Sequence, residues 1–244
     1  MKYFNEFEKL LYKFGNEEST VAFQDISLYV DVIDQIKDNL ALYNEYTIPG
    51  GTRPDQLAIQ LYRNPLYYWT FFLMNDSIRA RGWPLTNSEI EVLVKRDFSH
   101  IAVTTRDNLT GIFKVGQTVT GSSSGVTGTV KHRHVDLGQI FIESSSLFAA
   151  GEQLQSNVVV EGATITQTIN VHSSEYEYNA AHHYENADGE WVDIDPAIGP
   201  GAQLVEITNW DRYYNENEEL KRIRIIKPES INQLVSTYKK ALRS

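Results

Sequence analysis

Residues 50–83 constrain the fold most strongly, because each of two successive helix starts in this stretch is marked by a proline. Pro54 suits the first position of a helix, where the N–H that proline lacks would have no partner in any case, and Thr52 is a candidate N-cap. Asn64 and Pro65 repeat the arrangement and end the first helix, since a residue before proline disfavours helical backbone. The stretch therefore predicts two short helices joined by a tight turn.

The same stretch carries more aromatic surface than a unit of this size can bury. Four apolar residues at helical spacing are expected to form its core: Leu57, Leu61, Trp69 and Phe72. The remaining aromatic residues are expected to face a partner, because tyrosine and tryptophan are enriched among the residues that anchor protein interfaces. These predicted partner-binding residues are Tyr62, Tyr67, Tyr68 and Trp83.

Amphipathic helices are expected on both sides of this helix pair, because apolar residues recur there at helical spacing. They are predicted within residues 1–14, 26–46, 89–98, 208–221 and 228–242, although the first residues of 26–46 also suit an extended chain. The sequence Thr-Asn-Ser-Glu at 86–89 fits a capping box before one of them. Short strands are predicted at 101–105 and 223–226.

A block rich in Gly, Ser, Thr and Val interrupts the helical pattern between residues 111 and 170. It contains a weak repeat, because Phe-Lys-Val-Gly-Gln-Thr-Val at 113–119 resembles Phe-Ala-Ala-Gly-Glu-Gln-Leu at 148–154. Short alternating runs between glycine turns predict β-hairpins. Two such units predict a small β-sandwich or barrel, inserted as residues 106–172 into a helical host.

The expected fold class is therefore α+β, with a helix-pair core, flanking amphipathic helices and an inserted all-β domain. Beyond the insert, Asp188-Gly189 predicts a hairpin turn between strands at 181–185 and 190–194. The predicted domains are an N-terminal helical segment (1–49), a helix-pair module (50–105), the β-rich insert (106–172) and a tyrosine-rich hairpin with a C-terminal helical segment (173–244).

Composition excludes several classes of function. The chain has no cysteine, which excludes disulfides and thiolate metal sites. Its formal net charge of −10 argues against nucleic acid or an anionic membrane as the main partner, because both are bound through Lys and Arg. No apolar run approaches the roughly 18 residues of a membrane-spanning helix. We therefore expect neither partner, whereas the abundance of tyrosine favours protein interfaces.

Motifs for catalysis are scarce. Residues 121–125, Gly-Ser-Ser-Ser-Gly, resemble a nucleophile elbow, but they lie among strands and glycine turns, so a hairpin turn is the preferred interpretation. No glycine-rich phosphate-binding loop is present. An acidic run at 216–219 suits a solvated helix face. We expect no catalytic residues and no cofactor.

Two sets of histidines have spacings that metal sites use. They are His132 with His134, and His182 with His183 beside Asp193 and Asp195 across the expected hairpin. Exposed strand histidines are the preferred interpretation, because no third ligand stands at a suitable spacing, and we expect no metal. The two aspartates also suit the paired carboxylates of a glycoside hydrolase, although solvated acids at a strand end explain them more simply.

The motif of residues 51–76 resembles a known module. It reads Gly-Thr-Arg-Pro-Asp-Gln-Leu-Ala at 51–58, then Leu61-Tyr62, Asn64-Pro65, Tyr-Tyr-Trp at 67–69 and Met-Asn-Asp at 74–76. It is similar to the LysM module, in which a strand leads into two short helices and a return strand. It resembles more closely the LysM-like segment of the small baseplate wedge subunit of T4-like contractile-tailed phages, the wedge protein fifty-three family. Residues 217–232 resemble that family's closing segment.

The resemblance implies a structural protein without enzyme activity. It implies that residues 50–105 form a LysM-like module that contacts protein rather than sugar. The implied partners are other baseplate wedge proteins and neighbouring wedges around the tail hub, with six copies per baseplate. The implied location is the tail baseplate of the virion, assembled in the host cytoplasm. The β-rich insert lies outside the family pattern.

Two alternatives stay open on the sequence alone. One is a carbohydrate-binding module that recognises peptidoglycan through a LysM groove, and the other is an accessory of a cell-wall hydrolase. A hydrolase needs a catalytic domain of about 100 residues or more, and only the β-rich block and the tyrosine-rich segment remain to supply it.

Overall fold

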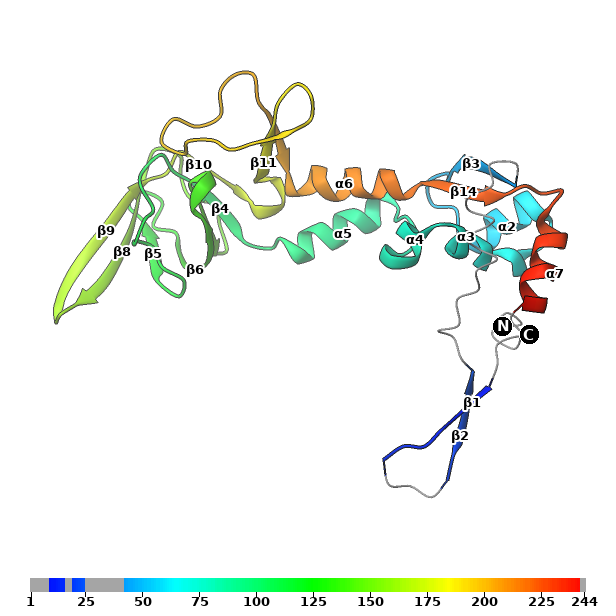
Figure 1. The fold of residues 1–244 in the computed structure, drawn as a ribbon. Coiled ribbons are helices and arrows are strands. Elements are labelled where there is room, and N and C mark those ends of the chain that lie inside the picture. Colours follow the sequence, from blue (N-terminus) through cyan, green and yellow to red (C-terminus); the bar gives the residue numbers. More distant parts are fainter. Residues whose placement is uncertain (1–8, 16–18, 25–41, 242–244) are drawn as a thin grey trace. The chain divides into compact units, whose positions relative to one another are not determined.

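The computed structural model describes residues 9–15, 19–24 and 42–241 (Figure 1). The chain divides into two compact units: unit 1 comprises residues 1–86 and 216–244, and unit 2 comprises residues 87–215. Both contain helices and antiparallel strands, which confirms the α+β class. The division cuts through two of the expected domains, because 50–105 and 173–244 each contribute to both units. Among the described helices, none is long and apolar enough to cross a membrane.

The sheet of unit 1 pairs strands that are far apart in the sequence. Strand β3 (Tyr43–Thr47) runs antiparallel to β14 (Arg222–Ile226), with Tyr46 opposite Ile223. The strand expected at 223–226 is thereby confirmed. The helix expected within 26–46 is wrong at its end, where pairing with β14 outweighs the helical spacing of the apolar residues. Residues 26–41 of that prediction lie outside the described part of the chain.

The expected helix pair is present between these strands. Helix α2 (Pro54–Tyr62) is followed by the 3₁₀ turn η2 (Pro65–Tyr67) and by helices α3 (Trp69–Met74) and α4 (Asp76–Arg81). As predicted, Asn64 caps the second start, because its Oδ1 accepts a hydrogen bond from Leu66 N–H at 3.0 Å. The N-cap of α2 is Arg53 rather than Thr52, and its backbone N–H donates to Gln56 Oε1 at 3.2 Å.

The core of unit 1 joins the helix pair, the two strands and helix α7 (Ile231–Ala241). Asn75 fastens α3 to β14: its amide nitrogen donates to the carbonyl oxygens of Phe71 and Arg224, and its Oδ1 accepts from Arg224 N–H at 2.7 Å. The buried core residues are Tyr43, Ile48, Leu57, Ala58, Tyr62, Trp69, Phe71, Met74, Ile78, Leu220, Ile223, Ile225, Ile226, Ile231, Val235 and Tyr238.

A two-stranded hairpin precedes this core along the chain. Strand β1 (Lys9–Tyr12) runs antiparallel to β2 (Val21–Gln24), with Leu11 opposite Ala22. The amphipathic helix predicted for residues 1–14 is therefore wrong over 9–12, and residues 1–8 lie outside the described part. Short apolar runs suit either structure, and here strand pairing decides.

Unit 2 contains one seven-stranded antiparallel sheet, where a sandwich or barrel was expected. Its strands, in spatial order, are β10 (Ser173–Tyr176), β4 (Ile101–Thr104), β7 (Gln139–Glu143), β6 (Thr127–His134), β5 (Thr118–Gly121), β8 (Gln153–Val160) and β9 (Ala163–Asn170). Helix α5 (Asn87–Asp97) leads into β4 through a short turn, as the capping box and the expected strand at 101–105 predict.

The two copies of the sequence repeat fold alike. Phe113 and Phe148 are both buried in the core of the sheet. The glycines three residues later, Gly116 and Gly151, both take positive φ, at 88° and 81°, which favours glycine at this position. Each copy then enters a hairpin, β5–β6 or β8–β9.

A smaller sheet completes unit 2. It has the order β12 (Trp191–Val192), β11 (Ala181–Glu185), β13 (Val205–Thr208), and the hairpin turn predicted at Asp188-Gly189 joins β11 to β12. Gly189 has a φ of 77°. Helix α6 (Asn209–Leu220), the expected helix at 208–221, follows β13.

Candidate functional site

The predicted core of the helix-pair module lies inside unit 1. Leu57 and Trp69 are buried, whereas Leu61 and Phe72 are half-buried and pack against the same core. The indole of Trp69 contacts the ring of Tyr238 with centroids 5.5 Å apart. Sequence reasoning missed Phe71, which is fully buried, because it falls between the positions of the predicted apolar face.

The four predicted partner-binding residues occupy different environments. Tyr62 lies in the core, where its hydroxyl donates to the carbonyl oxygen of Ile226 at 2.9 Å and burial raises its pKa. Tyr67, Tyr68 and Trp83 are half-buried at the margin of the core. Three of these four side chains are therefore accessible in part, and their role in binding stays a prediction.

Two of the three are also held by hydrogen bonds within unit 1. The Tyr67 hydroxyl donates to Asn232 Oδ1 at 2.8 Å, and Trp83 Nε1 donates to the carbonyl oxygen of Thr52 at 2.7 Å. These bonds fix the orientation of the rings at the surface, which reduces the entropy lost when a partner binds.

The hairpin β1–β2 exposes apolar side chains from both strands. Leu11 is 73% exposed and Phe23 is 45% exposed. Rings of Tyr12 and Phe23 flank that of Phe14, with centroids 4.9 Å and 5.6 Å away. The exposed set is Leu10, Leu11, Tyr12, Phe14, Val21 and Phe23, which we call the hairpin apolar set. Contiguous exposed apolar surface is a common feature of protein interaction sites.

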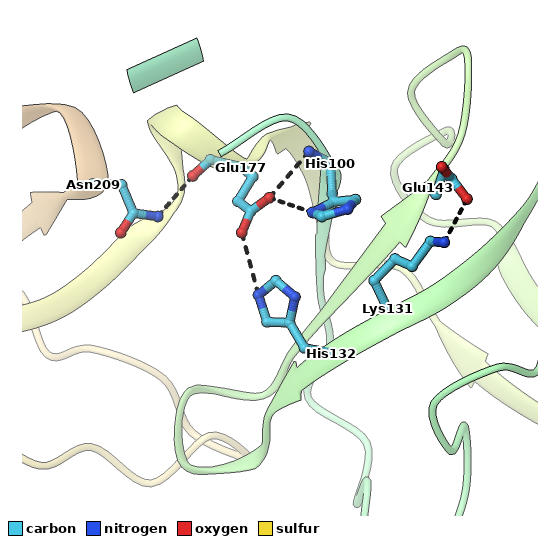
Figure 2. A network of polar contacts seen from close by, with 6 residues as sticks. All are labelled: His100, Lys131, His132, Glu143, Glu177 and Asn209. Atoms are coloured by element: carbon cyan, nitrogen blue, oxygen red, sulfur yellow. Dashed lines mark hydrogen bonds and ion pairs between the residues drawn. The ribbon is translucent and has the colours of Figure 1, made fainter. Parts of the chain in front are cut away.

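A polar cluster in unit 2 combines two histidines and a buried glutamate (Figure 2). His100 lies just before β4, His132 lies on β6, and Glu177 begins the 3₁₀ turn η4 (Glu177–Asn179). Glu177 Oε2 is 2.7 Å from His100 Nδ1 and also accepts from His100 N–H at 3.0 Å. Glu177 Oε1 is 3.2 Å from His132 Nε2. We call these three residues the His–Glu cluster.

Burial and nearby charges shift the pKa of His132 in the His–Glu cluster. The pKa of His132 is lowered by burial first and by His100 and His134, whereas Glu177 acts in the opposite direction. The His132 ring stacks on Phe141 with centroids 4.0 Å apart. Two imidazoles beside a carboxylate are a donor set that suits a divalent cation.

The sequence identified His132 as a candidate metal ligand, but it suggested His134 as the second ligand instead of His100 and Glu177. His134 does share its strand face, yet His100 and Glu177 are the residues that meet His132. The pairing of β10 with β4 brings them together, because Tyr176 lies opposite Ile101 and the next residues outward are Glu177 and His100. A sequence-based prediction that β10 pairs with β4 would have placed Glu177 beside His100.

The second histidine set forms a separate arrangement on β11. His183 stacks on Trp191 with centroids 3.9 Å apart, and its Nε2 lies 3.0 Å from Glu185 Oε1. His182 Nε2 lies 3.1 Å from an Arg212 nitrogen. Asp195 instead caps the following turn by accepting from Ala197 N–H at 2.9 Å.

The Gly-Ser-Ser-Ser-Gly stretch at 121–125 is a turn built around a buried carboxylate. Glu152 accepts hydrogen bonds from the backbone N–H groups of Ser123, Ser124 and Ala149 and from both serine hydroxyls. Burial raises the pKa of Glu152, but these hydrogen bonds outweigh it and lower the pKa to about 2. The serines therefore hold a structural anion, which supports the hairpin-turn interpretation over a nucleophile elbow.

Comparison with known proteins gives one family match. Residues 2–97 match the family model described as base plate wedge protein 53. No curated protein matches the chain. The family match confirms the resemblance of the N-terminal part to baseplate wedge proteins, and it ends before residues 217–232, whose resemblance stays a prediction.

Proposed function

We propose that this chain, of which residues 2–97 match the family model of base plate wedge protein 53, joins neighbouring subunits of a phage tail baseplate through protein–protein contacts. The family is one of structural baseplate proteins, and association with other baseplate proteins follows from it. The finer claims, which are contact with neighbouring wedges around the hub and six copies per baseplate, belong to this proposal.

The observation that carries the proposal is the hairpin apolar set, which lies within the matched residues. A two-stranded hairpin is marginally stable at best in water, and it needs further strands or packing against a helix to be stable. Leu11 and Phe23 expose apolar groups. Burial of such groups lowers the free energy by about 25 cal/mol per Å² of apolar surface. A second baseplate subunit offers such a surface, and an assembled particle would hold the hairpin permanently buried.

The proposal includes a LysM-like module whose return strand comes from the far end of the chain. The order β3, α2, α3, β14 is that of a strand, two helices and a return strand, and β3 and β14 pair antiparallel. The second strand of the module would be β14, which lies outside the residue range 50–105 that was predicted for the module. A module closed in this way presents Tyr67, Tyr68 and Trp83 at its margin for contact with protein.

Placing charge on the hairpin tests the proposal. We expect the double variant Leu11→Asp/Phe23→Asp to lower the yield of assembled baseplates by about tenfold or more, because charges replace apolar anchors at the contact. The variant is supplied in trans to a phage from which the gene has been deleted, and baseplates are counted by electron microscopy. The matched control is Val92→Asp, since Val92 is 70% exposed but lies on α5. Equal yields for the double variant and the control would overturn the proposal.

A second variant addresses the helix-pair module. We expect Tyr67→Ala to leave the melting temperature of unit 1 nearly unchanged and to weaken assembly, because the ring is half-buried and sits at the surface margin. Tyr67→Phe is the control, as it removes only the hydroxyl that binds Asn232. Assembly at the wild-type level with Tyr67→Ala would show that Tyr67 does not contribute to the interface.

A further inference from the structure

We propose that His100, His132 and Glu177 form a binding site for one Zn²⁺ ion, with His100 Nδ1, His132 Nε2 and a carboxylate oxygen of Glu177 as ligands. This site goes beyond the proposed assembly function and is independent of it, because all three residues lie in unit 2 and outside the hairpin apolar set.

The distances between the ligand atoms fit a zinc ion. Zinc–nitrogen and zinc–oxygen bonds are about 2.0–2.1 Å long, so ligand atoms in a tetrahedral site lie about 3.3 Å apart. Here Glu177 Oε2 lies 2.7 Å from His100 Nδ1, and the other carboxylate oxygen, Oε1, lies 3.2 Å from His132 Nε2. All three ligand atoms lie within 4.8 Å of one another. Small side-chain shifts therefore suffice to admit the ion.

A β-bulge aims His132 at this site. Val130 pairs with Ile142 and His132 pairs with Phe141, so Lys131 is an extra residue in β6. Without the bulge, His132 would lie on the same face as Val130, which is buried in the core of the sheet. With it, His132 lies on the opposite face and Lys131 turns outward to pair with Glu143 at 2.7 Å (Figure 2). Bulges often re-aim side chains in this way at functional sites.

The surroundings hold the ligands in place. The Glu177 side chain is only 5% exposed, and its backbone oxygen accepts from Asn209 Nδ2 at 2.8 Å. The His132 ring is fixed by stacking on Phe141. Buried carboxylates are costly unless they are paired or coordinate a metal. A divalent cation here would compensate the negative charge of Glu177 directly.

The donor set selects the metal class. Two imidazole nitrogens and one carboxylate oxygen suit zinc and related transition ions better than calcium or magnesium, which prefer all-oxygen sites. The fourth position of the tetrahedron is open to water, and His132 is about half exposed, which gives the ion access. The ion would tie together three segments separated by up to 77 residues, and so would stabilise unit 2.

Zinc binding to the full chain tests this proposal. Tag-free protein stripped with a chelator is titrated with Zn²⁺ by calorimetry, and Co²⁺ is added separately to read its visible absorption. We expect one equivalent of Zn²⁺ to bind, an absorption band typical of tetrahedral cobalt, and a higher melting temperature of unit 2. His132→Ala should weaken binding at least tenfold and abolish the band, and this variant should fold because His132 is about half exposed. Glu177→Gln should act in the same direction.

The matched control is the double variant His182→Ala/His183→Ala, which removes the other histidine pair of unit 2. It should bind zinc like the wild type. Three results would overturn the proposal: no binding by the wild-type chain, undiminished binding by His132→Ala, or loss of the bound ion in the control instead.

Discussion

Trp69→Ala is expected to lower the free energy of unfolding of unit 1 by about 3–5 kcal/mol. The indole is 7% exposed and contacts Tyr238 of α7, while Leu73, Ile226 and Val235 lie around it. Removing it takes away apolar burial and leaves a cavity between segments that come from opposite ends of the chain. Because hydrogen bonds such as those between Asn75 and Arg224 also fix these segments relative to one another, the surroundings cannot close the cavity by a small local shift.

Hydrogen exchange measures this loss of stability separately for each of the two units. Amides of α2 and β14 should lose protection by a factor that corresponds to 3–5 kcal/mol, whereas amides of β6 and β7 should keep theirs. The control is Trp191→Ala, which removes an indole that is 66% exposed and belongs to unit 2. Unchanged protection of α2 and β14 in Trp69→Ala would show that Trp69 does not hold the core together.

The elements that the sequence predicted correctly are those encoded by local chemistry. The helix starts at Pro54 and Asn64-Pro65 depend on residues next to one another, and so does the turn at Asp188-Gly189. Proline restricts its own backbone, and glycine tolerates positive φ, whatever the rest of the chain does. Such signals can be read without knowing which segments will meet.

The elements that were predicted wrongly depend on distant partners. Residues 9–12 carry apolar side chains that suit a helix or a strand, and pairing with β2 makes them a strand. Tyr43–Thr47 becomes β3 because β14 lies beside it, although the two strands are separated by most of the chain. Periodicity over four or five residues cannot report on a partner that far away.

The His–Glu cluster shows the same limit at the level of a site. His132 stood out because of its spacing from His134, but a bulge and the pairing of β10 with β4 decide which residues it meets. The aromatic residues of the helix-pair module were predicted as a group, and their division into buried Tyr62 and accessible Tyr67 required the fold.

Glu152→Gln is expected to destabilise unit 2 by roughly 2–3 kcal/mol at neutral pH. Glu152 Oε2 accepts from Ser123 N–H at 3.0 Å and from Ser124 N–H at 2.9 Å, and Oε1 accepts from Ala149 N–H at 2.6 Å. A glutamine must direct an NH₂ group at one of these sets of donors, so hydrogen bonds to a charged acceptor are lost and backbone donors are left unpaired. Urea unfolding monitors the loss, and Glu161→Gln, at an exposed turn between β8 and β9, is the control.

The pH dependence of this effect has a defined sign. The pKa of Glu152 falls from 4.5 to about 2 on folding, so the folded state binds its proton less tightly than the unfolded chain does. Its contribution to stability is therefore complete above about pH 4.5 and is lost as the pH falls towards 2. Glutamine does not titrate, so the stability difference between wild type and Glu152→Gln should shrink across this window. If the stability difference between wild type and Glu152→Gln stayed constant from pH 7 to about pH 3, the charge on Glu152 would not stabilise the serine turn. The effect of the substitution would then come from the size and shape of the side chain.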